Sequence, residues 1–197
     1  MWKIALFGTD VYHLIAAFVI YSMLGWLVES IYMSFCNKKL TNRGFAKSPF
    51  CPIYGFGAVF GYLIMCPLKV NHVLLYFTAA FLATTFEFIV GNVMIRLFGE
   101  LWWDYNDKFL NYKVIICLER TVAWGFYGLG IVCFLNERVI RFIDMIDQRV
   151  GMVLISVILS IVLVDYVFQL LKAFKVDLNK PKTAIVERYQ KIKARWS

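Results

Sequence analysis

The sequence predicts an all-α fold, a polytopic helical membrane protein with about five transmembrane helices. Of the 197 residues, 61% are hydrophobic and 17% are charged, and the mean hydropathy is +0.67. This composition is too apolar for a water-soluble domain of this size. Several apolar stretches reach the roughly 20 residues that cross a bilayer as a helix. They are continuous rather than alternating, which excludes a transmembrane β-barrel.

The spans follow one another with short connections. The first is not a cleavable signal, because Asp10 interrupts the leader and no small-residue cleavage site follows it. The second is bracketed by Pro52 and Pro67 and contains three glycines, so it is either a short span or a re-entrant segment. The predicted spans are 11–36, 53–69, 73–96, 115–135 and 150–172.

The distribution of Lys and Arg predicts the orientation, since cytoplasmic loops are enriched in them. With five spans and the N-terminus outside, 15 of the 21 basic residues lie in cytoplasmic segments and 5 lie outside; Arg120 falls within a span. This places the N-terminus outside and the C-terminus in the cytoplasm. If the second segment is re-entrant, both termini face the cytoplasm.

Two amphipathic stretches are predicted to lie at the membrane surface. One has the apolar stripe Val139, Ile143, Ile146 and Val150, and the other lies in the tail between 185 and 196. We expect residues 1–174 to form a single transmembrane domain and 175–197 to form a basic cytoplasmic tail. The tail's charge suits anionic lipid. It accounts for most of the chain's net +8, so no nucleic-acid partner is indicated.

Ionisable residues interrupt the apolar runs. Glu29, Glu87 and Arg120 each cost at least about 2.5 to 3.5 kcal/mol at mid-membrane, so each requires a partner or a function. Arg120 is expected to meet Glu87, Glu29 or both. Either these residues form a buried ion pair that fixes helix register, or they line a polar cavity that binds substrate or relays protons.

Two polar loops extend this candidate cavity. In the segment from Asn42 to Ala58, Arg43 can bind a carboxylate or a phosphate in a bidentate way. Either this group belongs to a phosphate-bearing headgroup or substrate, or Arg43 forms an internal salt bridge. The segment LWWDYND places Asp104 beside aromatic residues that are typical of the membrane interface. The predicted substrate or cavity residues are Glu29, Arg43, Tyr54, Glu87, Asp104, Tyr105, Asn111, Glu119 and Arg120.

Several kinds of chemistry have no support in the sequence. The five cysteines are widely spaced without a C-x-x-C, and there are two histidines, so neither a metal site nor a disulfide framework is indicated. No G-x-x-x-x-G-K-[ST] motif is present, so the chain has no P-loop for ATP hydrolysis. We therefore predict no cofactor and no metal.

The two halves of the chain show a short internal similarity. Each has an apolar segment with a glutamate (Glu29, Glu87), then a loop with an asparagine, then a Cys and a Gly-rich span (51–61, 117–130). Transporters are often built from such repeats.

These motifs resemble those of a bacterial family of membrane proteins, the type IV ABC-transporter or CmpB-like proteins. The resemblance runs through YSMLGWLVESIY, NRGF with CPIYGFGA, FEFIVG, WWDY and ICLERTVAWG, over residues 15–135. Ser48 and Asn106 depart from the family pattern. The resemblance implies a permease of the bacterial plasma membrane that works with a separate ATPase subunit, and a path through so small a chain implies a homo-oligomer.

Three functions fit these observations. The first is a transport component whose polar cavity binds a small polar or amphiphilic substrate. The second is a membrane-embedded enzyme acting on a lipid or isoprenoid phosphate, held by Arg43 and Arg120. The third is a non-catalytic membrane scaffold or regulator in which the ion pairs are structural.

Overall fold

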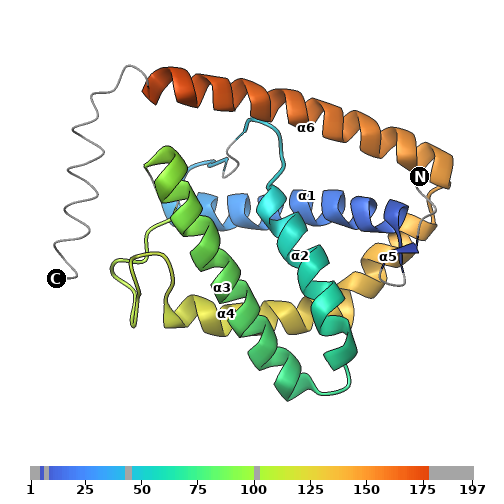
Figure 1. Cartoon of the computed structure of the whole chain (residues 1–197), viewed down its shortest axis with the longest axis horizontal. Coiled ribbons are helices and arrows are strands. Elements are labelled where there is room, and N and C mark those ends of the chain that lie inside the picture. Colours follow the sequence, from blue (N-terminus) through green and yellow to red (C-terminus); the bar gives the residue numbers. More distant parts are fainter. Residues whose placement is uncertain (1–4, 7–8, 43–45, 100–102, 178–197) are drawn as a thin grey trace. The chain divides into compact units, whose positions relative to one another are not determined.

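The computed structural model describes residues 5–6, 9–42, 46–99 and 103–177, and within them the chain is helical apart from its connections and one short hairpin (Figure 1). This confirms the predicted all-α fold class. Arg43 and the distal part of the basic tail lie outside the described residues. The elements are β1 (Ala5–Leu6), β2 (Thr9–Asp10), α1 (Val11–Asn37), α2 (Pro52–Met65), the 3-10 turn η1 (Cys66–Leu68), α3 (His72–Phe98), α4 (Leu118–Gly130), the π-helical stretch η2 (Ile131–Leu135), α5 (Asn136–Asp144) and α6 (Gln148–Asp177).

The helix boundaries follow from local capping. The Asp10 side chain accepts a hydrogen bond from the backbone N–H of His13 and starts α1, and Asn71 does the same for α3 through Leu74. Pro52 occupies the first turn of α2, where its missing N–H is not needed. At the end of α3, Gly99 takes a left-handed conformation with φ 68°, which glycine adopts without strain.

Within the part of the chain that the structure describes, three helices are long and apolar enough to cross a membrane. They are Val11–Phe35, His72–Leu97 and Gln148–Lys172, with hydropathies of 1.9, 1.9 and 2.5. Each matches a predicted span. The second predicted span is a shorter apolar helix, Pro52–Leu68, and the fourth is formed by α4 and η2.

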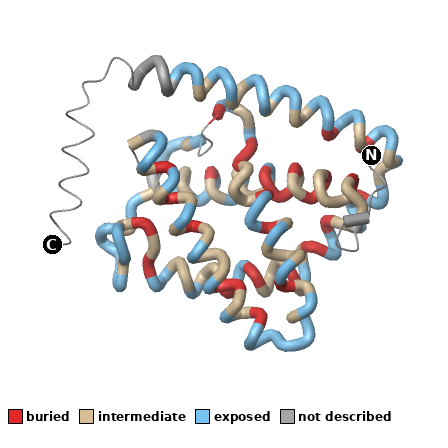
Figure 2. Tube along the Cα trace, in the orientation of Figure 1, coloured by how far each residue is buried: buried red, intermediate tan, exposed pale blue. Residues whose placement is uncertain are grey.

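The chain divides into two compact units. Unit 1 comprises Met1–Val70 and Gly130–Gln169, and unit 2 comprises Asn71–Leu129 and Leu170–Ser197. The core of unit 1 is built on α1, whose buried residues lie mainly in its first half (Figure 2). Its buried hydrophobic residues are Tyr12, Ala16, Ala17, Val19, Tyr21, Phe50, Ala58, Val139, Ile143 and Ile155.

The predicted amphipathic stripe near residue 140 packs into this core. Val139 and Ile143 are buried among the α1 residues, and α5 ends at Asp144. Val150 belongs to α6 and is exposed. The first two residues of the stripe, Val139 and Ile143, therefore pack against the apolar residues of α1.

Candidate functional site

The carboxylate of Glu87 in α3 is held by two aromatic side chains. The Tyr105 hydroxyl donates to Oε1 at 2.9 Å, and the Trp124 indole Nε1 donates to Oε2 at 2.9 Å. Glu87 is only 7% exposed although it lies within an apolar helix. Burial raises the pKa of the Tyr105 phenol and the Glu87 carboxylate raises it further, so the phenol keeps its proton and remains a donor.

Arg120 joins this site through Tyr105. Its guanidinium carbon lies 5.7 Å from the centre of the Tyr105 ring, a cation–π distance. One turn away, the hydroxyl of Thr84 donates to that of Thr121 at 3.0 Å and links α3 to α4. An acid, a cation and an aromatic ring thus share one small region of unit 2, and the contact described for Arg120 is with the Tyr105 ring, whereas an ion pair between Arg120 and Glu87 stays a prediction.

Glu29 has a related environment in unit 1. The Tyr54 hydroxyl at the start of α2 donates to Glu29 Oε2 at 2.6 Å. Gly25 lies one turn earlier on α1, and a Cβ there would overlap the Tyr54 ring. Glycine at this position therefore lets the tyrosine reach the acid. Glu29 and Tyr54, both predicted cavity residues, are in contact.

The start of the first loop is attached to α1. Asn42 Oδ1 accepts a hydrogen bond from the Trp26 indole at 2.7 Å, and its amide donates to the carbonyl of Lys47 at 3.3 Å. The neighbouring Arg43, predicted to bind a carboxylate or phosphate, lies outside the described residues.

The end of this loop is attached to α6. The backbone N–H of Ser48 donates to Asp165 Oδ2 at 2.6 Å, and the Tyr166 hydroxyl donates to the carbonyl of Phe50 at 3.0 Å. A charged acceptor makes the first of these bonds stronger than a neutral one. Asp165 therefore has a clear structural function, which is to hold the loop before α2.

The polar residues of the second loop mainly organise the loop itself. Asp104 accepts from the N–H of Asn106 at 2.8 Å, and the Asn111 amide donates to the carbonyls of Asn106 and Lys108 at 3.0 and 3.1 Å. Lys108 pairs with Glu119 at 2.8 Å. Asp104 and Glu119 are exposed, so these predicted site residues lie at the rim of the loop, away from the buried carboxylate.

Trp103 fastens the same loop to α3. Its indole donates to the carbonyl of Ile115 at 2.8 Å, and Ile115 packs so closely on Gly91 that a Cβ there would overlap it. This glycine lies one turn after Glu87. The packing brings the loop against α3 and allows Tyr105 to reach the carboxylate.

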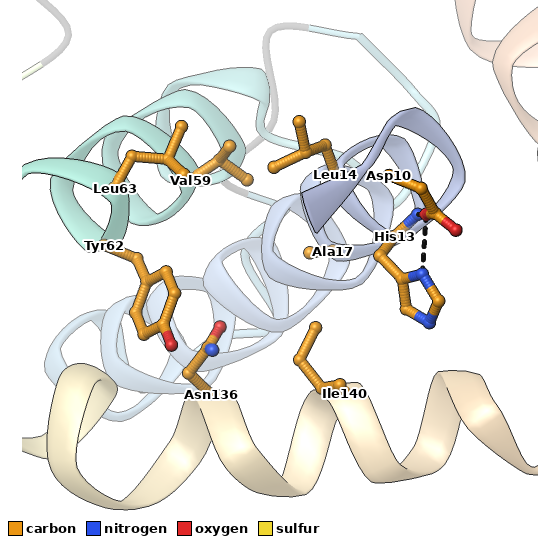
Figure 3. Close-up of a pocket in the computed structure, with 9 residues that line it drawn as sticks. All are labelled: Asp10, His13, Leu14, Ala17, Val59, Tyr62, Leu63, Asn136 and Ile140. Atoms are coloured by element: carbon orange, nitrogen blue, oxygen red, sulfur yellow. Dashed lines mark hydrogen bonds and ion pairs between the residues drawn. The ribbon is translucent and has the colours of Figure 1, made fainter. Parts of the chain in front are cut away.

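A groove in unit 1 was not predicted from the sequence. It has a cavity volume of about 360 Å³ and opens beside the first turn of α1 (Figure 3). Asn136, which is 6% exposed, accepts a hydrogen bond from the Tyr21 hydroxyl at 3.3 Å. The lining residues are Asp10, His13, Leu14, Ala17, Val59, Tyr62, Leu63, Asn136 and Ile140.

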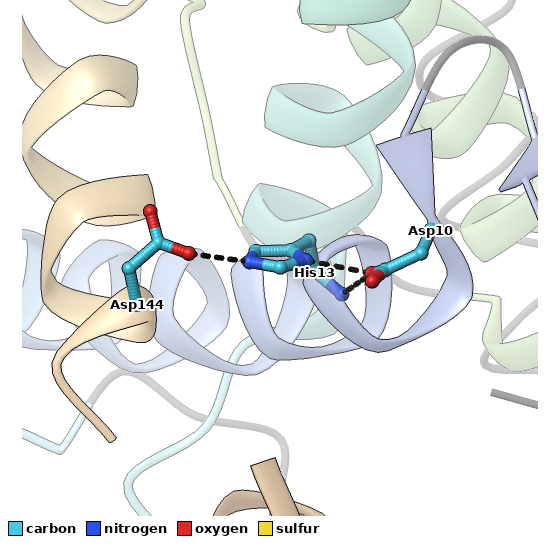
Figure 4. A network of polar contacts seen from close by, with 3 residues as sticks. All are labelled: Asp10, His13 and Asp144. Carbon is cyan, nitrogen blue, oxygen red and sulfur yellow. Dashed lines mark hydrogen bonds and ion pairs between the residues drawn. The ribbon is translucent and has the colours of Figure 1, made fainter. Parts of the chain in front are cut away.

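At the edge of this groove, His13 lies between two carboxylates (Figure 4). Its Nδ1 is 2.6 Å from Asp10 Oδ1, and its Nε2 is 2.9 Å from Asp144 Oδ1. Partial burial by itself raises the pKa of the Asp10 carboxyl. The hydrogen bonds from His13 outweigh burial and hold this pKa below its usual value. The contact joins the start of α1 to the end of α5. Sequence spacing gave no signal for it, because Asp144 is far away along the chain.

Among the described residues no group of three or more His, Cys, Asp or Glu side chains is arranged to hold a metal ion. Cys51, Cys66, Cys117 and Cys133 take part in no disulfide bond. The polar chemistry of the described residues therefore centres on the two glutamate sites and the groove.

Comparisons with known proteins place the chain in a family. No curated protein and no solved structure matches it. A family model with the description "Putative ABC-transporter type IV" matches residues 16–170, which include α2, α3, α4 and both glutamates. The match confirms the resemblance seen in the motifs. The chain belongs to this family of transporter-related membrane proteins.

Proposed function

We propose that the protein is the membrane-embedded component of a bacterial plasma-membrane transporter and that its two glutamates bind a small polar or amphiphilic substrate. One observation carries this proposal: Glu87 is buried within an apolar helix and held by two neutral donors. A carboxylate at such a position is costly and by default marks a functional site. The proposed site residues are the nine predicted from the sequence, together with Trp124.

The distribution of polar groups along α1 favours a transport path over a one-sided enzyme. Glu29 lies toward the end of this helix, whereas Asp10 and His13 border the groove at its start. Sixteen residues, from 13 to 29, separate His13 from Glu29, about 24 Å of helix. A path through a bilayer needs polar groups near both faces, and an enzyme acting on a cytoplasmic headgroup needs them near one.

The energy source would be a separate chain. The sequence has no P-loop, so a nucleotide-driven transporter requires an ATPase partner, and two copies of this small chain would enclose one path. The excess of Lys and Arg in the proposed inner loops supports an outside N-terminus and a cytoplasmic tail on anionic lipid.

Native mass spectrometry of the protein, extracted gently from its own membranes, tests the proposal. We expect a stoichiometric ATP-binding subunit and a bound small molecule. A monomer or homodimer that holds a specific phospholipid or isoprenoid phosphate, and no nucleotide-binding subunit, would overturn it in favour of a lipid-phosphate enzyme.

Matched variants locate the site in the same experiment. Glu87→Gln keeps the size of the side chain and should abolish retention of the small molecule while the protein still accumulates in the membrane. Glu137→Gln removes an exposed carboxylate that pairs with Arg141 and should have no effect. Loss of accumulation in Glu87→Gln alone would favour a purely structural role for Glu87.

A further inference from the structure

The helix pair α1 and α2 and the helix pair α3 and α4 contain the same hydrogen bond. In the first pair, the aromatic donor Tyr54 reaches Glu29, and in the second pair the aromatic donor Trp124 reaches Glu87. In both, the acceptor lies on a helix of 27 residues and the donor on the next helix along the chain.

The residue after each donor makes a second matched contact. Gly55 and Gly125 are both buried, and a Cβ at either position would overlap an aromatic residue of the long helix. For Gly55 this residue is Phe18, and for Gly125 it is Tyr76. Each aromatic residue lies 11 positions before its glutamate, from 18 to 29 and from 76 to 87.

The same aromatic residues form a third matched contact. Phe18 packs on Phe56 with ring centres 4.8 Å apart and planes inclined by 56°. Tyr76 packs on Phe126 with ring centres 5.0 Å apart and planes inclined by 67°. Phe56 and Phe126 each follow the close-packed glycine, so all three contacts come from an aromatic–Gly–Phe triplet.

The matched residues keep a constant offset within each helix of the pair, and we call these two offsets together the register. Residues of the first long helix match those 58 positions later, 18 with 76 and 29 with 87. Residues of the next helix match those 70 positions later, 54 with 124, 55 with 125 and 56 with 126. The same register aligns the end of α2 at Met65 with the end of η2 at Leu135. General amphipathic packing does not require this agreement, because it fixes neither residue types nor offsets.

We infer that the two helix pairs are copies of one ancestral pair and that Glu29 and Glu87 occupy the same site in the two copies, with Tyr54 and Trp124 as equivalent positioning residues. The chain thus carries two versions of one carboxylate site. The inference does not depend on transport; if transport holds, the path contains two equivalent acidic sites.

The contacts also revise the alignment suggested by the sequence. Cys51 and Cys117 are 66 positions apart, one helical turn out of the register that the contacts define. The amides of Asn42 and Asn111 both donate to carbonyls of their own loops, and Asn42 alone also accepts a hydrogen bond from an indole. On this inference the two glutamates pair as the sequence alignment has them, and the Cys and Gly-rich segments shift by one helical turn.

Donor exchange tests whether the two sites are equivalent. Infrared spectroscopy identifies the carboxylate band of each glutamate by its loss in Glu29→Gln or Glu87→Gln. Tyr54→Phe and Trp124→Phe remove the donors, and each should shift the band of its own glutamate. The exchanges Tyr54→Trp and Trp124→Tyr keep a donor and should return the band toward its original position. A purely packing role for the aromatic residues would leave the bands unmoved in all four variants and overturn the assignment.

The glycines test the shared register. Gly55→Ala and Gly125→Ala should lower the thermal unfolding temperature in detergent to a similar extent, because each adds a Cβ that overlaps the long helix, at Ser22 and Phe18 for Gly55 and at Tyr76 for Gly125. Gly130→Ala is the control, since no atom lies within 4 Å of its added Cβ. If either variant behaves like the control, the inference fails. If either variant does not accumulate, the donor exchange still decides. Neither measurement uses a partner or a substrate, so failure of the transport proposal would not affect the result.

Discussion

The two glutamate sites share a helix framework but differ in what surrounds the acid. Glu29 is half-buried and receives a hydrogen bond from Tyr54 on the second helix. Glu87 is buried and receives one from Trp124 on the second helix and another from Tyr105 in the loop. In both sites the helix pair supplies the acid and one donor. In the second site the loop adds a second donor, and there the acid is buried.

The two loops differ in what they are attached to. The end of the first loop is tied to α6 through Ser48 and Phe50, and Phe50 also packs on Phe18 of α1. In the second loop the Trp103 indole donates to the Ile115 carbonyl of the same loop, Ile115 packs on Gly91 of α3, and the Tyr105 hydroxyl reaches the Glu87 carboxylate. Both loops therefore contact the long helix of their own pair, and the first loop is attached to α6 as well.

The largest expected difference between the sites is in stability. Glu87→Leu leaves the Tyr105 and Trp124 donors without their acceptor, at about 1–3 kcal/mol for each buried donor. Glu29→Leu leaves Tyr54 without its acceptor at a half-exposed site, so we expect a smaller loss. Thermal unfolding in detergent measures both. Equal losses would mean that the loop contributes nothing to the second site.

Tyr105 separates two contributions within the second site. Tyr105→Phe removes the hydrogen bond to Glu87, at about 1 kcal/mol, but keeps the ring beneath Arg120. Tyr105→Leu also removes the cation–π contact, for a further loss of about 0.5–2 kcal/mol. The comparison uses the same unfolding assay. If both variants lose the same stability, Arg120 gains nothing from the ring.

The loop attachments are expected to act independently. Asp165→Asn removes the charge that accepts the Ser48 N–H, so hydrogen exchange at the end of the first loop should become faster. Trp103→Phe removes the bond to the Ile115 carbonyl and should speed exchange only in the second loop. Mass-spectrometric hydrogen exchange resolves the two segments. A variant that accelerates both loops would contradict separate attachment.

The smallest effect is expected at the rim of the second loop. Lys108 and Glu119 form an exposed ion pair, and such pairs contribute little because water and salt screen them. Lys108→Ala should leave the unfolding temperature almost unchanged at any salt concentration. A large, salt-dependent decrease would show that this exposed pair contributes substantially to stability.

Much of the fold was predictable because apolar runs and caps are local signals. Asp10, Pro52 and Gly99 mark helix ends directly in the sequence, and the helices begin or end beside them. The first, third and fifth predicted spans agree with α1, α3 and α6 to within a few residues. The exception is the stripe near Val139, whose period fits a lipid surface and a protein core equally well.

The candidate site was predictable in its charges but not in its partners. Glu87 and Arg120 stood out because charges in apolar runs are expensive. No sequence signal indicates that Trp124 is a hydrogen-bond donor to Glu87, since tryptophan is a usual residue in a membrane helix. The groove beside His13 depends on Asp144, a residue more than a hundred positions away. Contacts of that kind require the fold.

The packing of α6 predicts that its exposed and its buried positions differ in the substitutions they tolerate. Most of its large apolar side chains are exposed, whereas Ile155 belongs to the core and a Cβ on Gly151 would overlap the Tyr12 hydroxyl. In a saturation mutagenesis library, exposed positions such as Val157 and Val164 should accept any apolar residue and reject charges. Gly151 should accept almost nothing else, so its tolerance profile would mark the line along which this helix meets α1.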